Sequence, residues 1–168
     1  MTKIANGWSI DTDTIDFIHS VLPKGSTILE FGSGEGTAYL AKDYTMYSVE
    51  HNQDWVGKYN STYINAPIRG YSDTFPTPVI DGPQKGWYDS NIVLDAIKNI
   101  KYDLILIDGP NGEIGRGGFI NILDDIDTDV MLIFDDVHRQ PELDLMQKVS
   151  TKLNKPYTMV NAITGYIK

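Results

Sequence analysis

The chain of 168 residues contains no cysteine, which excludes a disulfide framework and any zinc site built from thiolates. It also lacks an apolar run long enough to span a bilayer, and its N-terminus lacks the apolar core of a signal peptide. We therefore expect a cytoplasmic protein with no membrane partner. Cationic residues are few, because 14 Lys and Arg stand against 23 Asp and Glu, a net charge of −9. This negative charge argues against broad nucleic-acid binding and favours a neutral substrate or one carried by a cation.

The length and composition of the chain are those of one globular domain, which we place at residues 1–168. Apolar segments of strand and helix periodicity alternate along it, which predicts an α/β fold: a Rossmann-like, doubly wound, mainly parallel sheet with a C-terminal antiparallel hairpin. The expected helices cover about residues 11–22, 37–42, 51–56, 90–99, 118–126 and 141–154. The expected strands cover about residues 27–31, 46–50, 62–64, 102–107, 130–134, 157–160 and 164–168.

A proline- and glycine-rich insertion near residues 66–88 interrupts this alternation. Such a stretch cannot form a long helix or a central strand, so we expect a long loop or a hairpin arm. It is either a lid or substrate platform that carries Tyr71, Phe75, Trp87 and Tyr88, or a contact in a homo-oligomer.

A glycine-rich turn follows the first predicted strand in the pattern Glu30-x-Gly32-x-Gly34-x-Gly36. Glycines at such a turn let another molecule lie against the backbone, and the first amides of the following helix point at it. Glu50 closes the next strand, about twenty positions further on, where a carboxylate can bind ribose hydroxyls. The pattern therefore predicts a nucleoside site.

The spacing differs from the G-x-G-x-x-G of dinucleotide-binding folds and resembles the first motif of class I S-adenosylmethionine-dependent methyltransferases. The resemblance implies that Glu30 lies near the amino end of the cofactor's methionine, that Gly32, Gly34 and Gly36 make room for the ligand, and that Glu50 binds the ribose. His51 would flank the adenosine, and Asp108 is a further cofactor-binding candidate. The alternatives are a nucleotide-cofactor oxidoreductase and a catalytically silent nucleoside-binding or assembly module.

Acids also end two later strands: Asp108 follows one, and Asp135 with Asp136 follows the next. Neighbouring parallel strands end at the same edge of a sheet, so these carboxylates are expected to converge. Carboxylates that lie so close repel one another, and a divalent cation with oxygen ligands relieves the repulsion. We expect Mg²⁺ or Mn²⁺ at Asp108, Asp135 and Asp136.

The same acids resemble the metal site of metal-dependent O-methyltransferases of the catechol and macrolide-sugar types. The phrase from Ile107 to Gly112, followed by Gly115-Arg116, also resembles the methyltransferases of plant glucuronoxylan and related polysaccharide enzymes. These resemblances imply methyl transfer to a hydroxyl oxygen, with a sugar, polysaccharide or other small-molecule acceptor as the partner. Asp108 is also a catalytic candidate, and His138 and Arg116 are two more.

His138 is the candidate base, because a hydroxyl is a poor nucleophile until it is deprotonated and imidazole titrates near neutrality. The alternative is a histidine on a surface loop. Arg116 could bind an acidic group of the substrate such as a uronate, pair with the aspartates, or be solvated.

Overall fold

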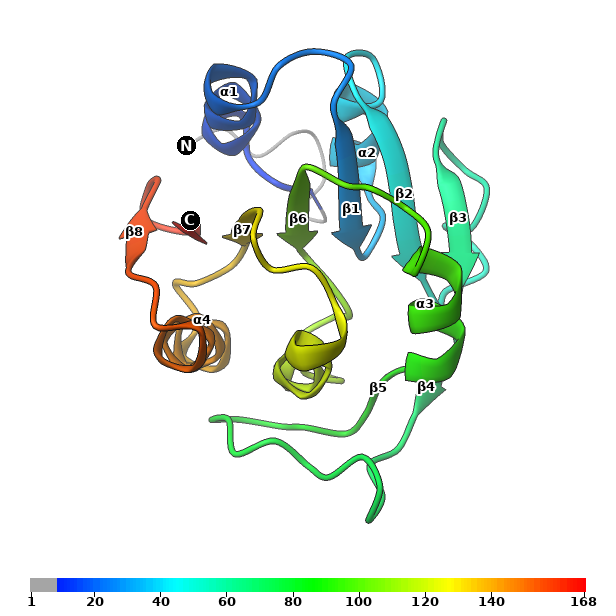
Figure 1. Cartoon of the computed structure of the whole chain (residues 1–168), viewed down its shortest axis with the longest axis vertical. Helices are drawn as coiled ribbons and strands as arrows, with labels where there is room; N and C mark the ends of the chain where they lie inside the picture. The colour runs from blue at the N-terminus through cyan, green and yellow to red at the C-terminus, as the bar shows by residue number, and fades with distance from the viewer. Residues whose placement is uncertain (1–8) are drawn as a thin grey trace.

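The computed structural model describes residues 9–168 and is built on one seven-stranded sheet, in the order β3-β2-β1-β6-β7-β9-β8 (Figure 1). Pairing is parallel from β3 to β7, whereas β9 is antiparallel to both β7 and β8. This confirms the predicted mainly parallel α/β sheet and its C-terminal antiparallel hairpin. The strands are β1 Thr27–Phe31, β2 Thr45–Glu50, β3 Thr62–Asn65, β6 Leu104–Ile107, β7 Met131–Phe134, β8 Tyr157–Met159 and β9 Gly165–Ile167.

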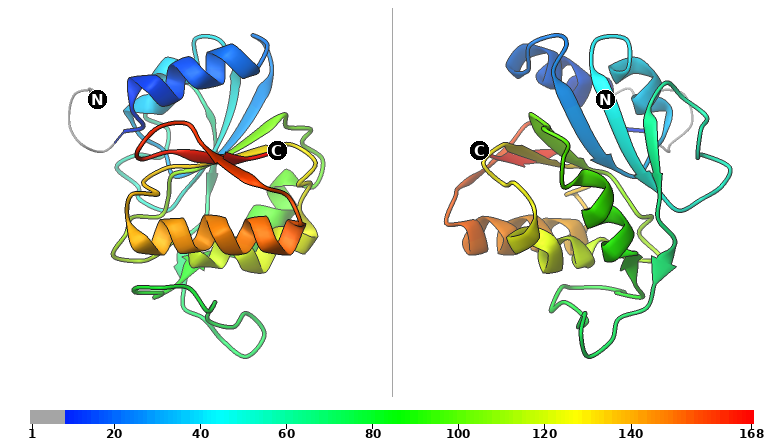
Figure 2. Two further views of the ribbon diagram at one scale, coloured as in Figure 1. Left: turned by 90° about the vertical axis from the view of Figure 1, so that its left-hand side faces the viewer. Right: turned by 45° about the vertical axis from the view of Figure 1, so that its right-hand side comes forward.

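Helices cover both faces of the sheet, as Figure 2 shows for α1 on one side and α4 on the other. One face packs against α1 (Thr12–Val21) and α2 (Glu35–Leu40), and the other against α3 (Ser90–Ile97), the 3-10 helix η1 (Gly117–Asp125) and α4 (Gln140–Leu153). All four residues of β6 and of β7 are buried. Helices cover both faces of these parallel strands, which explains why their sequences are continuous apolar runs.

Alternate residues of β6 belong to different cores, because successive side chains of a strand point to opposite faces. Leu104 and Leu106 pack with the apolar residues of α1 and α2, while Ile105 and Ile107 pack with those of α3, η1 and α4. The sheet is thus fixed on both sides, and the ends of its strands form a rigid edge on which a site can be built.

Two predicted helices differ from the structure. Residues 53–57 form turns instead of a helix, because Asn52 accepts the Asp54 N–H in a local turn and Gly57 follows with a left-handed φ of 77°. The helix predicted at 118–126 is the 3-10 helix η1. It begins with two glycines, which are poor helix formers, and a Cβ on Gly118 would lie 2.4 Å from the Cβ of Trp87. This close packing on Trp87 replaces the predicted α-helix start.

The insertion is a hairpin arm, because the short strands β4 (Ile68–Arg69) and β5 (Trp87–Tyr88) pair antiparallel at its base. Its loop is fastened to the helices beneath it. Lys148 of α4 donates to the carbonyl of Val79, and the side chain of Asn121 in η1 donates to the carbonyl of Pro76 at 2.7 Å.

Two of the four aromatic residues of the insertion lie in the protein interior. Trp87 and Tyr88 are 0% and 1% exposed, because β5 packs against the sheet and η1. Tyr71 and Phe75 are partly buried against the same core. Among the described residues, no helix is both long and apolar enough to cross a membrane.

Candidate functional site

A cavity of about 520 Å³ opens where β1, β2, β6 and β7 end. It is lined by eight of the residues that the sequence analysis placed in a site: Gly32, Glu50, His51, Asp108, Arg116, Asp135, Asp136 and His138. The carboxyl ends of the strands in an open α/β sheet are where such folds bind ligands. The fold therefore gathers most of the predicted residues around one space.

Gly32 is required at the turn after β1 by both its conformation and its surroundings. Its φ is +89°, and a Cβ there would lie 2.8 Å from the Cα of Gly109, in the loop after β6. A side chain would therefore push the two loops apart. This close approach brings the turn after β1 and Asp108 to the same wall of the cavity.

Three of the predicted cofactor residues, Glu30, Gly34 and Gly36, do not line the cavity. A Cβ on Gly36 would lie 2.7 Å from a side-chain carbon of Ile10, so this glycine serves packing of α2 against the N-terminal segment. Gly34 caps the start of α2 in an extended conformation, and its N–H donates to the Thr37 hydroxyl at 3.1 Å.

Glu30 is connected to the glycine-rich turn through buried hydrogen bonds. Its carboxylate is buried and accepts hydrogen bonds from the hydroxyls of Thr37, at 2.6 Å, and Ser48. Burial raises the pKa of Glu30 to about 7, although both hydroxyl bonds act to lower it. Thr37 in turn accepts from Gly34, so the acid is linked to the turn through one side chain.

Glu50 ties together the loops that follow β1 and β2. One carboxylate oxygen accepts the N–H of Ser33 at 2.9 Å, and the other accepts the N–H groups of His51 and Asn52, each at 2.8 Å. A carboxylate offers about four lone-pair positions. Glu50 therefore retains capacity for a ribose hydroxyl at the mouth of the cavity that it lines.

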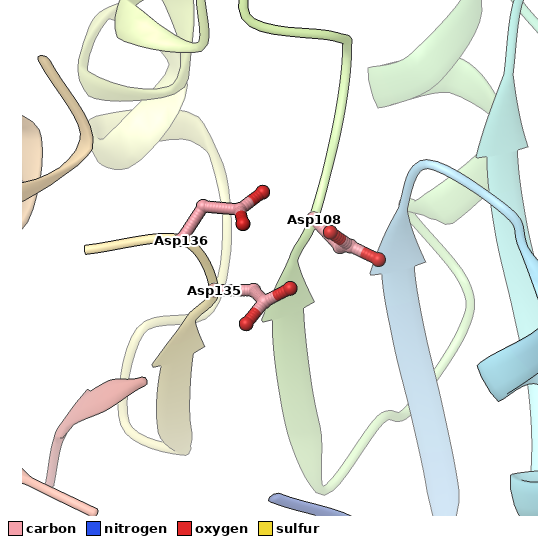
Figure 3. Close-up of side chains that lie close together, drawn as sticks. All are labelled: Asp108, Asp135 and Asp136. Atoms are coloured by element: carbon pink, nitrogen blue, oxygen red, sulfur yellow. The ribbon is translucent and has the colours of Figure 1, made fainter. Parts of the chain in front are cut away.

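The carboxylates of Asp108, Asp135 and Asp136 converge at the ends of the neighbouring strands β6 and β7 (Figure 3). One oxygen from each lies within 4.8 Å of the others. Burial raises the pKa of Asp108 well above its ordinary value, and the charge of Asp135 raises it further, against the opposing effect of Arg116. Burial and the charge of Asp136 likewise raise the pKa of Asp135. The predicted convergence of these acids is confirmed.

Arg116 is only 5% exposed and pairs with the aspartates. This pairing was one of the three alternatives that the sequence left open. Its guanidinium donates to the carbonyls of Pro110 and Asp135 and to the Asp136 carboxylate at 3.1 Å, and lies 3.5 Å from Asp108. Arg139, which the sequence analysis missed, donates to Asp136 at 2.6 Å. With its donors used in this way, Arg116 holds the two loops together and is poorly placed to bind a substrate carboxylate.

The donor set fits a divalent cation in three respects. Carboxylate oxygens are the ligands of Mg²⁺ and Mn²⁺, and their spacing allows a shared ion. Burial, and after it the charges of Asp135 and Asp136, raise the pKa of Asp108 against the effect of Arg116, and a cation at this place would stabilise the ionised carboxylate. A cation there would share Asp136 with the two guanidinium groups.

Four buried polar atoms of residues that line the cavity have no hydrogen-bond partner within residues 9–168: the Ser9 hydroxyl, the Tyr88 hydroxyl, Nδ1 of His51 and Nε of Arg139. Nδ1 of His51 lies 3.2 Å from a Glu50 oxygen without the alignment of a hydrogen bond. Buried polar groups are nearly always bonded, so a cluster of exceptions around one cavity indicates groups that a ligand satisfies. No sequence motif marks Ser9 or Tyr88, because their positions depend on how distant segments pack.

The sequence matches no protein-family model and no curated protein. Solved structures share the fold at low identity. A precorrin 8w decarboxylase from Methanobacterium thermoautotrophicum superposes with a TM-score of 0.59 and 13% identity, over 99% of this chain and 95% of that chain. A methyltransferase-like protein from Silicibacter pomeroyi gives a TM-score of 0.58 and 19% identity, over 98% and 88%.

MycE, a methyltransferase of mycinamycin biosynthesis in complex with Mg, S-adenosylhomocysteine and mycinamycin VI, gives a TM-score of 0.57 and 11% identity. The match covers 94% of this chain and 48% of MycE, so this chain spans about half of that protein. At these identities the likeness shows the fold alone, a mainly parallel α/β sheet that this chain shares with proteins named a methyltransferase, a methyltransferase-like protein and a decarboxylase. One neighbour is named a decarboxylase, so the fold does not by itself set the reaction.

Proposed function

We propose that this protein is an S-adenosylmethionine-dependent methyltransferase that acts on a hydroxyl oxygen, with a sugar or polysaccharide as the acceptor. The observation that carries the proposal is the cavity at the strand ends, which is lined by Gly32, Glu50 and Asp108 and by buried polar atoms without a partner in the described part of the chain. The cofactor, when bound, supplies an electrophilic methyl group on a sulfonium.

The charges of the cavity suit this cofactor better than a dinucleotide. S-adenosylmethionine has no phosphate and carries positive charge on its sulfonium and ammonium groups, which carboxylates stabilise. A dinucleotide would bring a pyrophosphate to a cavity lined by Asp108, in which the guanidinium groups of Arg116 and Arg139 are already paired with Asp136. Charge complementarity therefore favours S-adenosylmethionine over NAD.

The acceptor end of the proposed site lies beside the three aspartates. Mg²⁺ or Mn²⁺ held there by Asp108, Asp135 and Asp136 would bind the acceptor hydroxyl and lower its pKa. His138, an exposed residue in the lining of the same cavity, would take up the proton. The proposal takes support from MycE, whose structure contains Mg and mycinamycin VI alongside S-adenosylhomocysteine.

Two experiments test this function. Mass spectrometry of ligands released from the purified protein should detect S-adenosylmethionine or S-adenosylhomocysteine. Methyl transfer from radiolabelled S-adenosylmethionine should then be measured over a panel of glycans, uronates and phenols, with Mg²⁺ and with EDTA. We expect labelled product from a hydroxyl acceptor that depends on the metal. Cofactor binding without transfer to any acceptor would instead support a catalytically silent binding module.

A further inference from the structure

Tyr88 reaches the cavity wall from the insertion arm rather than from the seven-stranded sheet. It is the last residue of β5, and Asp89 directly after it caps α3 by accepting two backbone N–H groups. Tyr88 is therefore held between a paired strand and a capped helix, and its ring position is well determined by the backbone on both sides.

The ring of Tyr88 lies among the ends of three strands. Its centroid is 6.1 Å from that of Phe31 at the end of β1 and 5.9 Å from that of His51 just after β2. Its hydroxyl is close to Gly109, just after β6, because a Cβ on that glycine would lie 2.6 Å from the hydroxyl oxygen. The hydroxyl is thus at the place where the turn after β1 meets the loop after β6.

The Tyr88 hydroxyl differs from those of the other buried tyrosines in having no partner. Tyr88 is 1% exposed, and its hydroxyl has no hydrogen-bond partner among the residues that the structure describes. By contrast, Tyr44 donates to the carbonyl of Leu22 at 3.0 Å, and Tyr102 donates to the carbonyl of Asp127 at 3.1 Å. A buried hydroxyl without a partner is destabilising, so its retention needs a reason other than the stability of the empty protein.

The groups around Tyr88 keep its hydroxyl in the neutral form. Burial raises its pKa well above the ordinary value, the charge of Glu50 adds to this, and Arg116 opposes it. The phenol can therefore both donate and accept a hydrogen bond at neutral pH.

We propose that the Tyr88 hydroxyl is a cofactor-binding group, whose partner is a polar atom of bound S-adenosylmethionine. The inference rests on the proposed function, and it adds a residue of the insertion to a site otherwise built by strand ends. It also gives the arm a role: β5 and the cap of α3 hold this hydroxyl over the turn after β1.

The test compares Tyr88→Phe with the matched control Tyr44→Phe. Each removes one buried hydroxyl and keeps the ring, but only the Tyr44 hydroxyl has a protein partner. The probe is S-adenosylhomocysteine, the unreactive product of the proposed reaction, titrated by calorimetry, and the melting temperature of each protein is measured without ligand.

We expect Tyr88→Phe to weaken the affinity by about 3- to 10-fold, the loss of one hydrogen bond. Its melting temperature without ligand should be unchanged or higher, because an unsatisfied buried group is removed. Tyr44→Phe should lower the melting temperature and leave the affinity unchanged. Equal affinity of the wild type and Tyr88→Phe would overturn the proposal while the function stands, as would a melting temperature of Tyr88→Phe that falls as far as that of Tyr44→Phe. Failure of the wild type to bind the probe would overturn the proposed function and, with it, this assignment.

Discussion

Glu30 provides a quantitative prediction, because it is a buried acid whose pKa rises from an ordinary value of 4.5 to about 7. The folded protein holds this proton more tightly than the unfolded chain does, so the contribution of Glu30 to stability falls as the pH rises through this window. One pKa unit corresponds to about 1.4 kcal/mol, which makes the whole effect about 3 kcal/mol. About 2 kcal/mol of it falls between about pH 5.5 and about pH 8.5.

The substitution Glu30→Gln removes this titration and keeps an oxygen that can accept from the hydroxyls of Thr37 and Ser48. Urea denaturation of both proteins across this pH range should show Glu30→Gln gaining about 2 kcal/mol relative to the wild type as the pH rises. Other groups that titrate in the window cancel in the difference. The exposed Glu113 provides the control, since Glu113→Gln should leave the difference flat. A flat difference for Glu30→Gln as well would refute the reasoning.

Four further predictions concern the cavity. Gly32→Ala should lower the free energy of unfolding by about 1–3 kcal/mol more than Gly25→Ala, as measured by urea denaturation. Both glycines have a positive φ, but only a Cβ at position 32 would meet backbone atoms, those of Gly109. Glu50→Gln should weaken S-adenosylmethionine binding by about 10- to 100-fold in calorimetry, and unchanged affinity would place the ribose elsewhere. EDTA should abolish methyl transfer and Mg²⁺ or Mn²⁺ restore it, whereas full activity in excess EDTA would remove the metal from the account. His138→Ala should slow methyl transfer by about 10²- to 10⁴-fold at unchanged cofactor affinity, and a rate near that of the wild type would exclude it as the base.

The sheet and the convergence of its acids could be predicted because both follow from short-range patterns. The apolar runs that became β6 and β7 end in Asp108 and in Asp135 with Asp136, and adjacent parallel strands bring their ends together. The pairing of Arg116 remained one of several alternatives, because it depends on the path of the loop after β6 rather than on periodicity.

Features that depend on distant packing could not be predicted. The sequence left Tyr88 on either a lid or substrate platform or an oligomer contact, and only the packing of β5 against the sheet shows that it is buried in the cavity wall. The helix expected at 51–56 has suitable residues, but Asn52 and Gly57 favour turns, and Glu50 holds the first amides of the segment. Tertiary packing thus decides the position of Tyr88, whereas local turn contacts, which the apolar pattern does not show, decide the segment after Glu50.

The central claim, that the cavity takes a nucleoside cofactor without phosphates, is tested most directly by calorimetric titration of the purified wild-type protein with S-adenosylmethionine and, separately, with NADH. We expect saturable binding of about one S-adenosylmethionine per chain and no binding of NADH, because Asp108 lines the cavity and the guanidinium groups of Arg116 and Arg139 are already paired with Asp136. Binding of NADH in preference to S-adenosylmethionine would contradict the account.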